Sequence, residues 1–103
     1  MRFRRKKDQA QEREDQKKSL DEAIIMADVR LLGVSRRSEV LTVIETAEDL
    51  DEARENLQAL LGIDWVGATA ILDLQFRRLP AREREKLLDH RDELVRERRN
   101  LDE

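Results

Sequence analysis

Residues 64–79, with the sequence DWVGATAILDLQFRRL, would form a helix that is apolar on more than one side. A helix of that kind is normally buried between other helices. Asp64 predicts the start of this helix, because its carboxylate can accept hydrogen bonds from the first free backbone N–H groups. We therefore expect a helix over residues 65–79 at the centre of a helical core, with Leu72 and Phe76 one turn apart on it.

Two shorter helices are expected before this central one. Gly33 is a candidate helix stop, after which Ser35 can cap a second helix whose residues 40–47 carry an apolar stripe. Asp49 and Glu52 have the spacing of a capping box, which predicts a third helix that begins at Leu50. We expect Gly62 to end that third helix.

The two ends of the chain predict long helices that carry heptad repeats. The N-terminal repeat, in a helix over 2–32, consists of Phe3, Ala10, Lys17, Ile24 and Leu31. Pro80 fits the first turn of the last helix. The repeat of that helix consists of Leu87, Leu94 and Leu101, which alternate along the seam with Arg84, Arg91 and Arg98. The stems of these arginines can cover a neighbouring helix while their charged ends reach water.

Together these patterns predict an all-α fold of about five helices in a single domain, residues 1–103. Its N- and C-terminal helices would form an antiparallel coiled-coil arm, residues 1–32 and 80–103. The shorter helices would form a small head, residues 33–79.

Composition agrees with long helices and limits the function. Charged residues make up 44% of the 103 residues and aromatic residues 3%. Cysteine is absent, which excludes disulfides and thiolate metal sites and favours a reducing, cytoplasmic setting. No apolar run approaches the roughly 20 residues that a membrane span needs, and the basic N-terminus is not followed by the apolar segment of a secretory signal. We expect no membrane association.

The net charge is −3, but positive charge gathers at the N-terminus. This basic tip consists of Arg2, Arg4, Arg5, Lys6 and Lys7. It could contact DNA phosphate weakly. The alternative is that these residues form an ordinary solvated helix start. Recognition of bases by stacking requires aromatic side chains, and Phe3 is the only one near the tip.

The sequence shows no catalytic, cofactor-binding or metal-binding constellation. His90 is the only histidine and lies in a charged run, which is typical of a surface side chain. The acidic residues 49–55 lie at a helix start, where they favour the helix dipole. The three glycines make no phosphate-binding pattern. We expect a non-enzymatic chain without cofactors or metals.

Several segments of the chain resemble the A subunits of DNA gyrase and topoisomerase IV. These segments are AILDLQFRRL (70–79), EREKLLD (83–89), SEVLTVIE (38–45) and DEAREN (51–56). The resemblance implies the coiled-coil dimerisation region, or exit gate, in which a helical head at the end of a long arm joins two protomers. The cleavage chemistry of that family uses a tyrosine, and this chain has none.

The resemblance, with the apolar residues expected in the head, favours a non-catalytic homodimer that associates with gyrase or topoisomerase subunits. Candidate dimer contacts are Trp65, Leu72 and Phe76; an equal alternative is that Trp65 fills the monomer core. Two other functions stay open: a nucleic-acid-binding helical protein that uses its basic tip, and a fragment of a type IIA topoisomerase. The sequence does not identify the partner or the helix face that would form the dimer.

Overall fold

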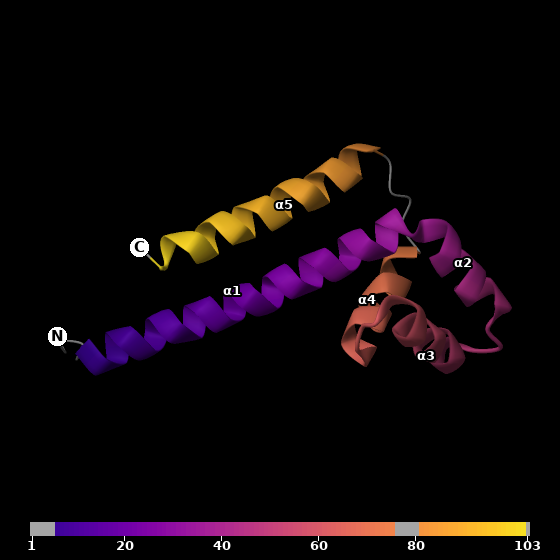
Figure 1. The fold of residues 1–103 in the computed structure, drawn as a ribbon, viewed down its shortest axis with the longest axis horizontal. Helices are drawn as coiled ribbons and strands as arrows, with labels where there is room; N and C mark the ends of the chain where they lie inside the picture. The colour runs from indigo at the N-terminus through magenta and orange to yellow at the C-terminus, as the bar shows by residue number, and fades with distance from the viewer. Residues whose placement is uncertain (1–5, 76–80, 103) are drawn as a thin grey trace.

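The computed structural model describes residues 6–75 and 81–102, and all of its regular elements in these ranges are helices (Figure 1). They are α1 (Lys6–Ser35), α2 (Arg37–Thr46), α3 (Leu50–Leu61), α4 (Trp65–Gln75) and α5 (Ala81–Asn100). The prediction of an all-α fold with about five helices is confirmed. Phe76, Leu79 and Pro80, on which part of the expected boundary between the last two helices rested, lie outside the described residues.

Helices α1 and α5 run antiparallel, with the start of α1 and the end of α5 at the same end of the molecule (Figure 1). We call this pair the arm. Three ion pairs join α1 to α5 and to the turn that follows it: Lys17 to Asp102 at 3.1 Å, Asp21 to Arg98 at 2.9 Å and Asp28 to Arg91 at 2.9 Å. The second and third pairs are separated by one heptad on each helix, so they fix one antiparallel register.

The heptad repeats place apolar side chains between the two arm helices. Ala27 is buried, and Ile24, Leu31, Leu94 and Leu101 are half-buried. The predicted coiled-coil arm is therefore confirmed in its direction and in the part of its seam that includes Ile24 and Leu31, whereas Ala10 is exposed and Phe3 lies outside the described residues. Arg91 and Arg98 reach acidic residues of α1 as well as water, which the sequence alone did not specify.

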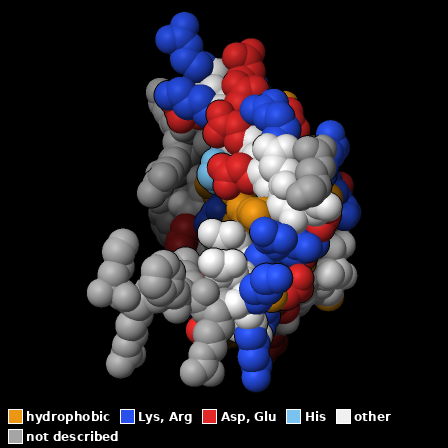
Figure 2. Space-filling view, turned by 90° about the vertical axis from the view of Figure 1, so that its left-hand side faces the viewer, with side chains coloured by type: hydrophobic (Ala, Val, Ile, Leu, Met, Phe, Trp, Pro, Cys, Tyr) orange, Lys and Arg blue, Asp and Glu red, His pale blue; other side chains and the backbone are white. Residues whose placement is uncertain are grey.

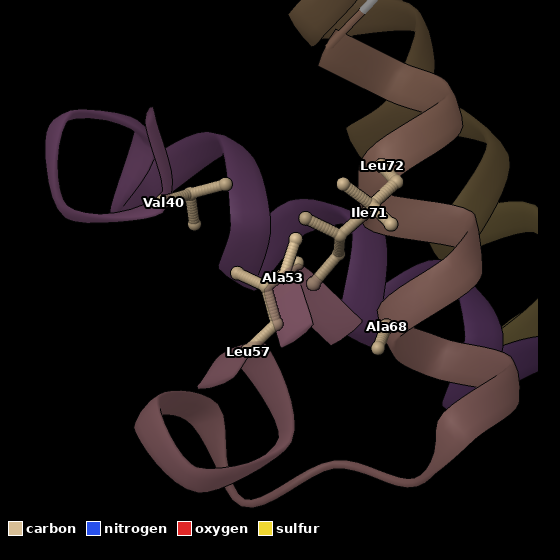
Figure 3. Packing of buried hydrophobic residues seen from close by; sticks show 6 residues of the cluster. All are labelled: Val40, Ala53, Leu57, Ala68, Ile71 and Leu72. Carbon is tan, nitrogen blue, oxygen red and sulfur yellow. The ribbon is translucent and has the colours of Figure 1, made fainter. Parts of the chain in front are cut away.

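The core lies in the head, which we define as α2, α3 and α4. Figure 3 shows side chains from these three helices converging on one another. The cluster consists of Val40, Ala53, Leu57, Ala68, Ile71 and Leu72. Val40, Leu57 and Ile71 are completely buried, and α4 supplies half of the cluster. The prediction that residues 65–79 hold the centre of the core is confirmed for the described part of that stretch.

Local capping chemistry sets the ends of α3 and the start of α4. The Asp49 carboxylate accepts a hydrogen bond from the Glu52 backbone N–H at 2.8 Å, and Glu52 in turn accepts one from the Glu48 N–H at 3.0 Å. Gly62 ends α3 in the left-handed conformation, with a φ of 66°. The Asp64 carboxylate accepts a hydrogen bond from the Gly67 N–H at 2.8 Å. The predicted roles of Asp49, Gly62 and Asp64 are thus confirmed.

The prediction that α1 stops at Gly33 and that Ser35 caps the next helix was wrong. α1 continues to Ser35, whose hydroxyl donates back to the Leu32 carbonyl oxygen at 2.9 Å. Gly33 is buried inside α1 against Ile71, where a Cβ atom would lie 3.0 Å from the Ile71 Cγ1 atom. The absence of a side chain at Gly33 lets α1 pack closely on α4, and α1 continues through this residue as an ordinary helix.

Arg36 joins the start of α2 to the end of α3. It occupies the N-cap position of α2 without a side-chain cap. Its guanidinium donates to the Glu39 carboxylate at 3.1 and 2.6 Å and to the Leu60 carbonyl oxygen at 3.4 Å. The last contact satisfies one of the carbonyl groups that a helix leaves free at its C-terminus.

The molecule is elongated, with extents of 58 × 29 × 23 Å and a radius of gyration of 17.6 Å. A compact domain of 100 residues has a radius of gyration of about 13 Å. The difference reflects the part of the arm that extends beyond the head (Figure 1). In the described ranges no helix has both the length and the apolar character to cross a membrane alone; α3 and α4, bent by 109°, meet those two criteria only as a pair.

Candidate interaction surface at the junction of arm and head

The first turn of α4 leaves two large apolar side chains exposed. Trp65 is 44% exposed and Val66 is 60% exposed. The expectation that residues 65–79 are buried on all sides is therefore corrected for this turn, because α1 and α3 cover other sides of α4. Trp65 does not fill the monomer core, which removes the alternative that the sequence left equal.

A clamped arginine holds the Trp65 ring in place. The Arg54 guanidinium carbon lies 5.1 Å from the centre of the ring, a cation–π geometry. Arg54 Nε donates to the Thr69 hydroxyl at 3.1 Å, and Nη1 donates to the Asp51 carboxylate at 3.1 Å. Contacts to both α3 and α4 thus hold the half-buried Arg54 against the exposed Trp65 ring.

A groove of about 480 Å³ lies beside this pair, between α1, α4 and α5. Its lining residues are Met26, Arg30, Val66, Thr69, Ala70, Asp73, Leu74 and Leu87. Val66 follows Trp65 in the chain, and Thr69 belongs both to the groove and to the Arg54 cluster. We therefore treat Arg54, Trp65 and the groove residues as one surface, the junction surface.

Two charged side chains of opposite sign line this apolar groove. Arg30 extends from α1 and is half-buried, and Asp73 belongs to α4 and is exposed. In residues 6–75 and 81–102, neither has a hydrogen-bond or ion-pair partner. Both remain solvated in the single chain, and both would need a partner if another molecule covered the groove.

The other predicted contact residues lie elsewhere. Leu72 is only 4% exposed and belongs to the head core, which leaves little of its side chain for a second copy. A dimer contact at this position is therefore corrected to a core position. Phe76 lies outside the described residues. Among the residues proposed as dimer contacts, Trp65 is the one that the structure places at the surface.

The structure describes only part of the basic tip. Arg2, Arg4 and Arg5 lie outside the described residues, whereas Lys6 and Lys7 are exposed in the first turn of α1. Figure 2 views the molecule from the free end of the arm and shows basic and acidic side chains intermixed on the described surface. The DNA contact of the basic tip, three of whose five residues lie outside the described ranges, stays a prediction.

The next question is whether the described residues could bind a metal ion or carry out catalysis. His90 is exposed on α5. Within 6–75 and 81–102, no group of three or more His, Cys, Asp or Glu side chains is arranged to hold a metal ion.

Sequence reasoning missed Arg54, Arg30 and Asp73 as parts of this surface. One signal was available for Asp73, a lone charge within the apolar run 70–74. No local pattern marks Arg54 or Arg30, because their roles depend on which helices pack together.

The described residues thus form an all-α fold with an antiparallel arm and an exposed Trp65 beside a groove. The comparison with known proteins is more specific, since half of the chain is a gyrase A-like region. It is 55% identical over 51 residues to the DNA gyrase A protein of Nocardioides sp. (strain ATCC BAA-499 / JS614), a stretch that covers 50% of this chain and 6% of that protein.

Two further relatives show the same partial match. The DNA gyrase A protein of Mycobacterium tuberculosis (strain ATCC 25618 / H37Rv) is 49% identical over 51 residues, or 50% of this chain and 6% of that protein. Its counterpart from Streptomyces coelicolor is 45% identical over 56 residues, or 54% of this chain and 6% of the relative. The chain thus spans only a small part of the length of these relatives, and no family model matches it.

Proposed function

We propose that this chain is a non-catalytic, gyrase-A-like dimerisation module, a single domain in which the head carries the contact and the arm extends from it. The observation that carries the proposal is the exposed Trp65, held by Arg54 beside an apolar groove, in a chain half of which matches gyrase A. Aromatic residues and arginines are enriched among the residues that dominate interface energetics. The resemblance of the chain to the gyrase exit gate, where two protomers meet, supports the same function.

The non-catalytic part of the proposal rests on residue chemistry. DNA cleavage in the resembled family proceeds through a tyrosine, and the 103 residues contain no tyrosine. The chain also has no cysteine, and its one histidine is exposed on the arm. Any role in DNA topology would therefore be exerted through a partner, for which gyrase or topoisomerase subunits in the cytoplasm are our candidates.

Sedimentation equilibrium tests self-association directly. We expect a dimer at micromolar concentration, with twice the 12.2 kDa mass of the single chain. A monomer at every concentration up to about 100 µM would contradict the proposal, because specific interfaces of standard size bind more tightly than that.

The substitution Trp65→Ala locates the contact. We expect it to raise the dimer dissociation constant tenfold or more, which corresponds to about 1.4 kcal/mol or more, while helicity by circular dichroism is kept. Leu88→Ala is the matched control, since Leu88 is 51% exposed but does not line the junction surface. Equal effects of the two substitutions would contradict a contact at Trp65.

A pull-down with the tagged chain, scored for gyrase subunits, tests the proposed heterologous partner. We expect capture of the gyrase A protein and loss of that capture in Trp65→Ala. Failure to capture any topoisomerase subunit would limit the function to self-association.

A further inference from the structure

The junction surface holds one cation and one anion that nothing in the described part of the chain neutralises. Arg30 and Asp73 line the same groove, and the remaining lining is largely apolar: Met26, Val66, Ala70, Leu74 and Leu87. A protein that covers this groove removes water from both charges. Such a contact is stable only if it brings an acid to Arg30 and a base to Asp73.

A second copy of this chain already has both groups. In a twofold interface the same surface is used by both subunits, so if residue i contacts residue j, then j also contacts i. When two junction surfaces face each other, Arg30 can meet the partner subunit's Asp73 while Asp73 meets the partner subunit's Arg30. Both charges are neutralised on both sides, and the apolar lining is buried in the same step.

Two other hollows of the described surface lack this self-complementarity. The groove of about 600 Å³ between α1 and α5 contains Arg84 and Asp28, but Asp28 already pairs with Arg91 at 2.9 Å. The hollow of about 420 Å³ near the end of the arm is lined by one acidic residue, Glu97, and by no basic residue. Of these three hollows, the junction groove alone presents an unpaired cation together with an unpaired anion among the residues described.

We infer that the junction groove is the self-association face of this chain and that two reciprocal Arg30–Asp73 ion pairs set the register of the dimer. This inference rests on the proposed dimerisation and adds the face and the pairing residues to it. The Trp65–Arg54 pair beside the groove contributes the aromatic part of the contact. Long charged side chains that pair across an interface exclude wrong registers more than they raise affinity, because like charges would meet there.

Charge reversal tests the pairing in trans. Arg30→Asp and Asp73→Arg should each weaken dimerisation about a hundredfold, since each variant places like charges opposite one another twice. An equimolar mixture of the two variants should form a heterodimer with near wild-type affinity, because one Arg30–Asp73 pair is kept as it is and the other is restored with its charges reversed. The double variant Arg30→Asp/Asp73→Arg should dimerise with itself, because both pairs are then restored with their charges reversed.

Arg96→Asp and Asp89→Arg are the matched controls. Both residues are exposed on α5 and neither lines the junction groove. Each makes the same change of charge as one of the test variants. We expect both controls to dimerise as the wild type does, and circular dichroism of every variant shows whether the helices are kept.

The outcomes separate this inference from the dimerisation on which it rests. A wild-type dimer that is unaffected by Arg30→Asp, or variants that do not form a heterodimer when mixed, would overturn the Arg30–Asp73 pairing and leave dimerisation standing. A wild-type monomer would overturn both. If Arg30→Asp lost capture of the gyrase A protein without any change in self-association, the groove would belong to that heterologous partner and the inference would be overturned.

Discussion

Two glycines of this chain act through different physical properties. Gly62 has a φ of 66° and a Cβ atom there would meet nothing within 4 Å, so its role is conformational. Gly33 has ordinary helical geometry, but a Cβ atom would meet three carbon atoms of Ile71 at 3.0 to 3.3 Å. Gly67 on α4 similarly receives Val29 of α1, whose Cγ1 atom would lie 3.3 Å from a Cβ atom at Gly67. The two helices therefore pack closely through one small residue on each.

The substitution Gly33→Ala should lower the free energy of unfolding by up to about 2 kcal/mol. Alanine favours a helix by about 1 kcal/mol over glycine, but overpacking a well-filled core costs about 1–3 kcal/mol. Ile71 is completely buried and has little freedom to move aside. Denaturant unfolding measures the change.

A double-mutant cycle checks the cause of that loss. In an Ile71→Ala background the three close carbon atoms are absent, so Gly33→Ala should be neutral or stabilising there. A loss of the same size in both backgrounds would show that Ile71 is not the reason for the glycine.

At the scale of the helices, a network of ion pairs holds the end of the arm. Arg98 donates to Asp21 at 2.9 Å and to Asp102 at 2.9 Å, and Asp102 also pairs with Lys17 at 3.1 Å. The hydrogen bond from Arg98 is the main cause that lowers the pKa of the Asp102 carboxyl below its ordinary value, and the one from Lys17 is the second. The hydrogen bonds to Asp102 and Asp21 raise the pKa of Arg98. These groups are at the surface, so the network sets the register of the helices more than it adds stability.

The lowered pKa of Asp102 gives a pH dependence of definite sign. A carboxyl with a lower pKa in the folded state stabilises that state above its unfolded pKa of about 3.9 and loses this contribution as the pH falls through the folded value. We expect arm helicity to be constant from pH 7 to about 5 and to decrease below about pH 4. Carbon NMR titration of Asp102 in the wild type and in Arg98→Gln measures the effect.

In Arg98→Gln the pKa of Asp102 should move up toward its ordinary value, because the largest cause of the shift is removed. An Asp102 pKa in the wild type at or above that of an unfolded peptide would contradict the network.

At the scale of the whole molecule, an elongated arm is joined to a small head that contains the main core. The arm depends on a half-polar seam and surface ion pairs, whereas the head buries Val40, Leu57 and Ile71 completely. Helices without extensive apolar packing are marginal in water. The head is therefore the more stable part of the molecule. The junction surface lies where the head packs against the arm.

The purified chain should neither relax nor cleave supercoiled plasmid, with or without ATP and magnesium. It contains no tyrosine to form a covalent link to DNA, and it spans only about 6% of the length of its gyrase A relatives. Gel electrophoresis of the plasmid, with active gyrase as the positive control, measures this. Reproducible covalent attachment of the chain to DNA would contradict it.

Much of the fold could be predicted from the sequence because it is encoded by neighbouring residues. The carboxylates of Asp49 and Asp64 bond backbone groups three residues away, and Gly62 adopts a conformation that few other residues tolerate. The heptad repeats likewise place one face of each arm helix on the other. The candidate site could be predicted less well. Trp65 was identified as a candidate contact, but its exposure was not predicted. Leu72 was expected on the core helix and also as a dimer contact, and its burial agrees with the first of these expectations.

By itself the sequence determined the presence of about five helices, the caps of α3 and of the start of α4, the antiparallel arm and the absence of a tyrosine nucleophile. Only the tertiary structure decided that α1 passes through Gly33, that Arg54 clamps Trp65, and that Arg30 and Asp73 share one groove. The physical reason is the distance along the sequence between the residues that contact each other. A cap or a heptad is set by contacts a few residues apart, whereas Gly33 with Ile71 and Arg30 with Asp73 are brought together only when α1 packs against α4.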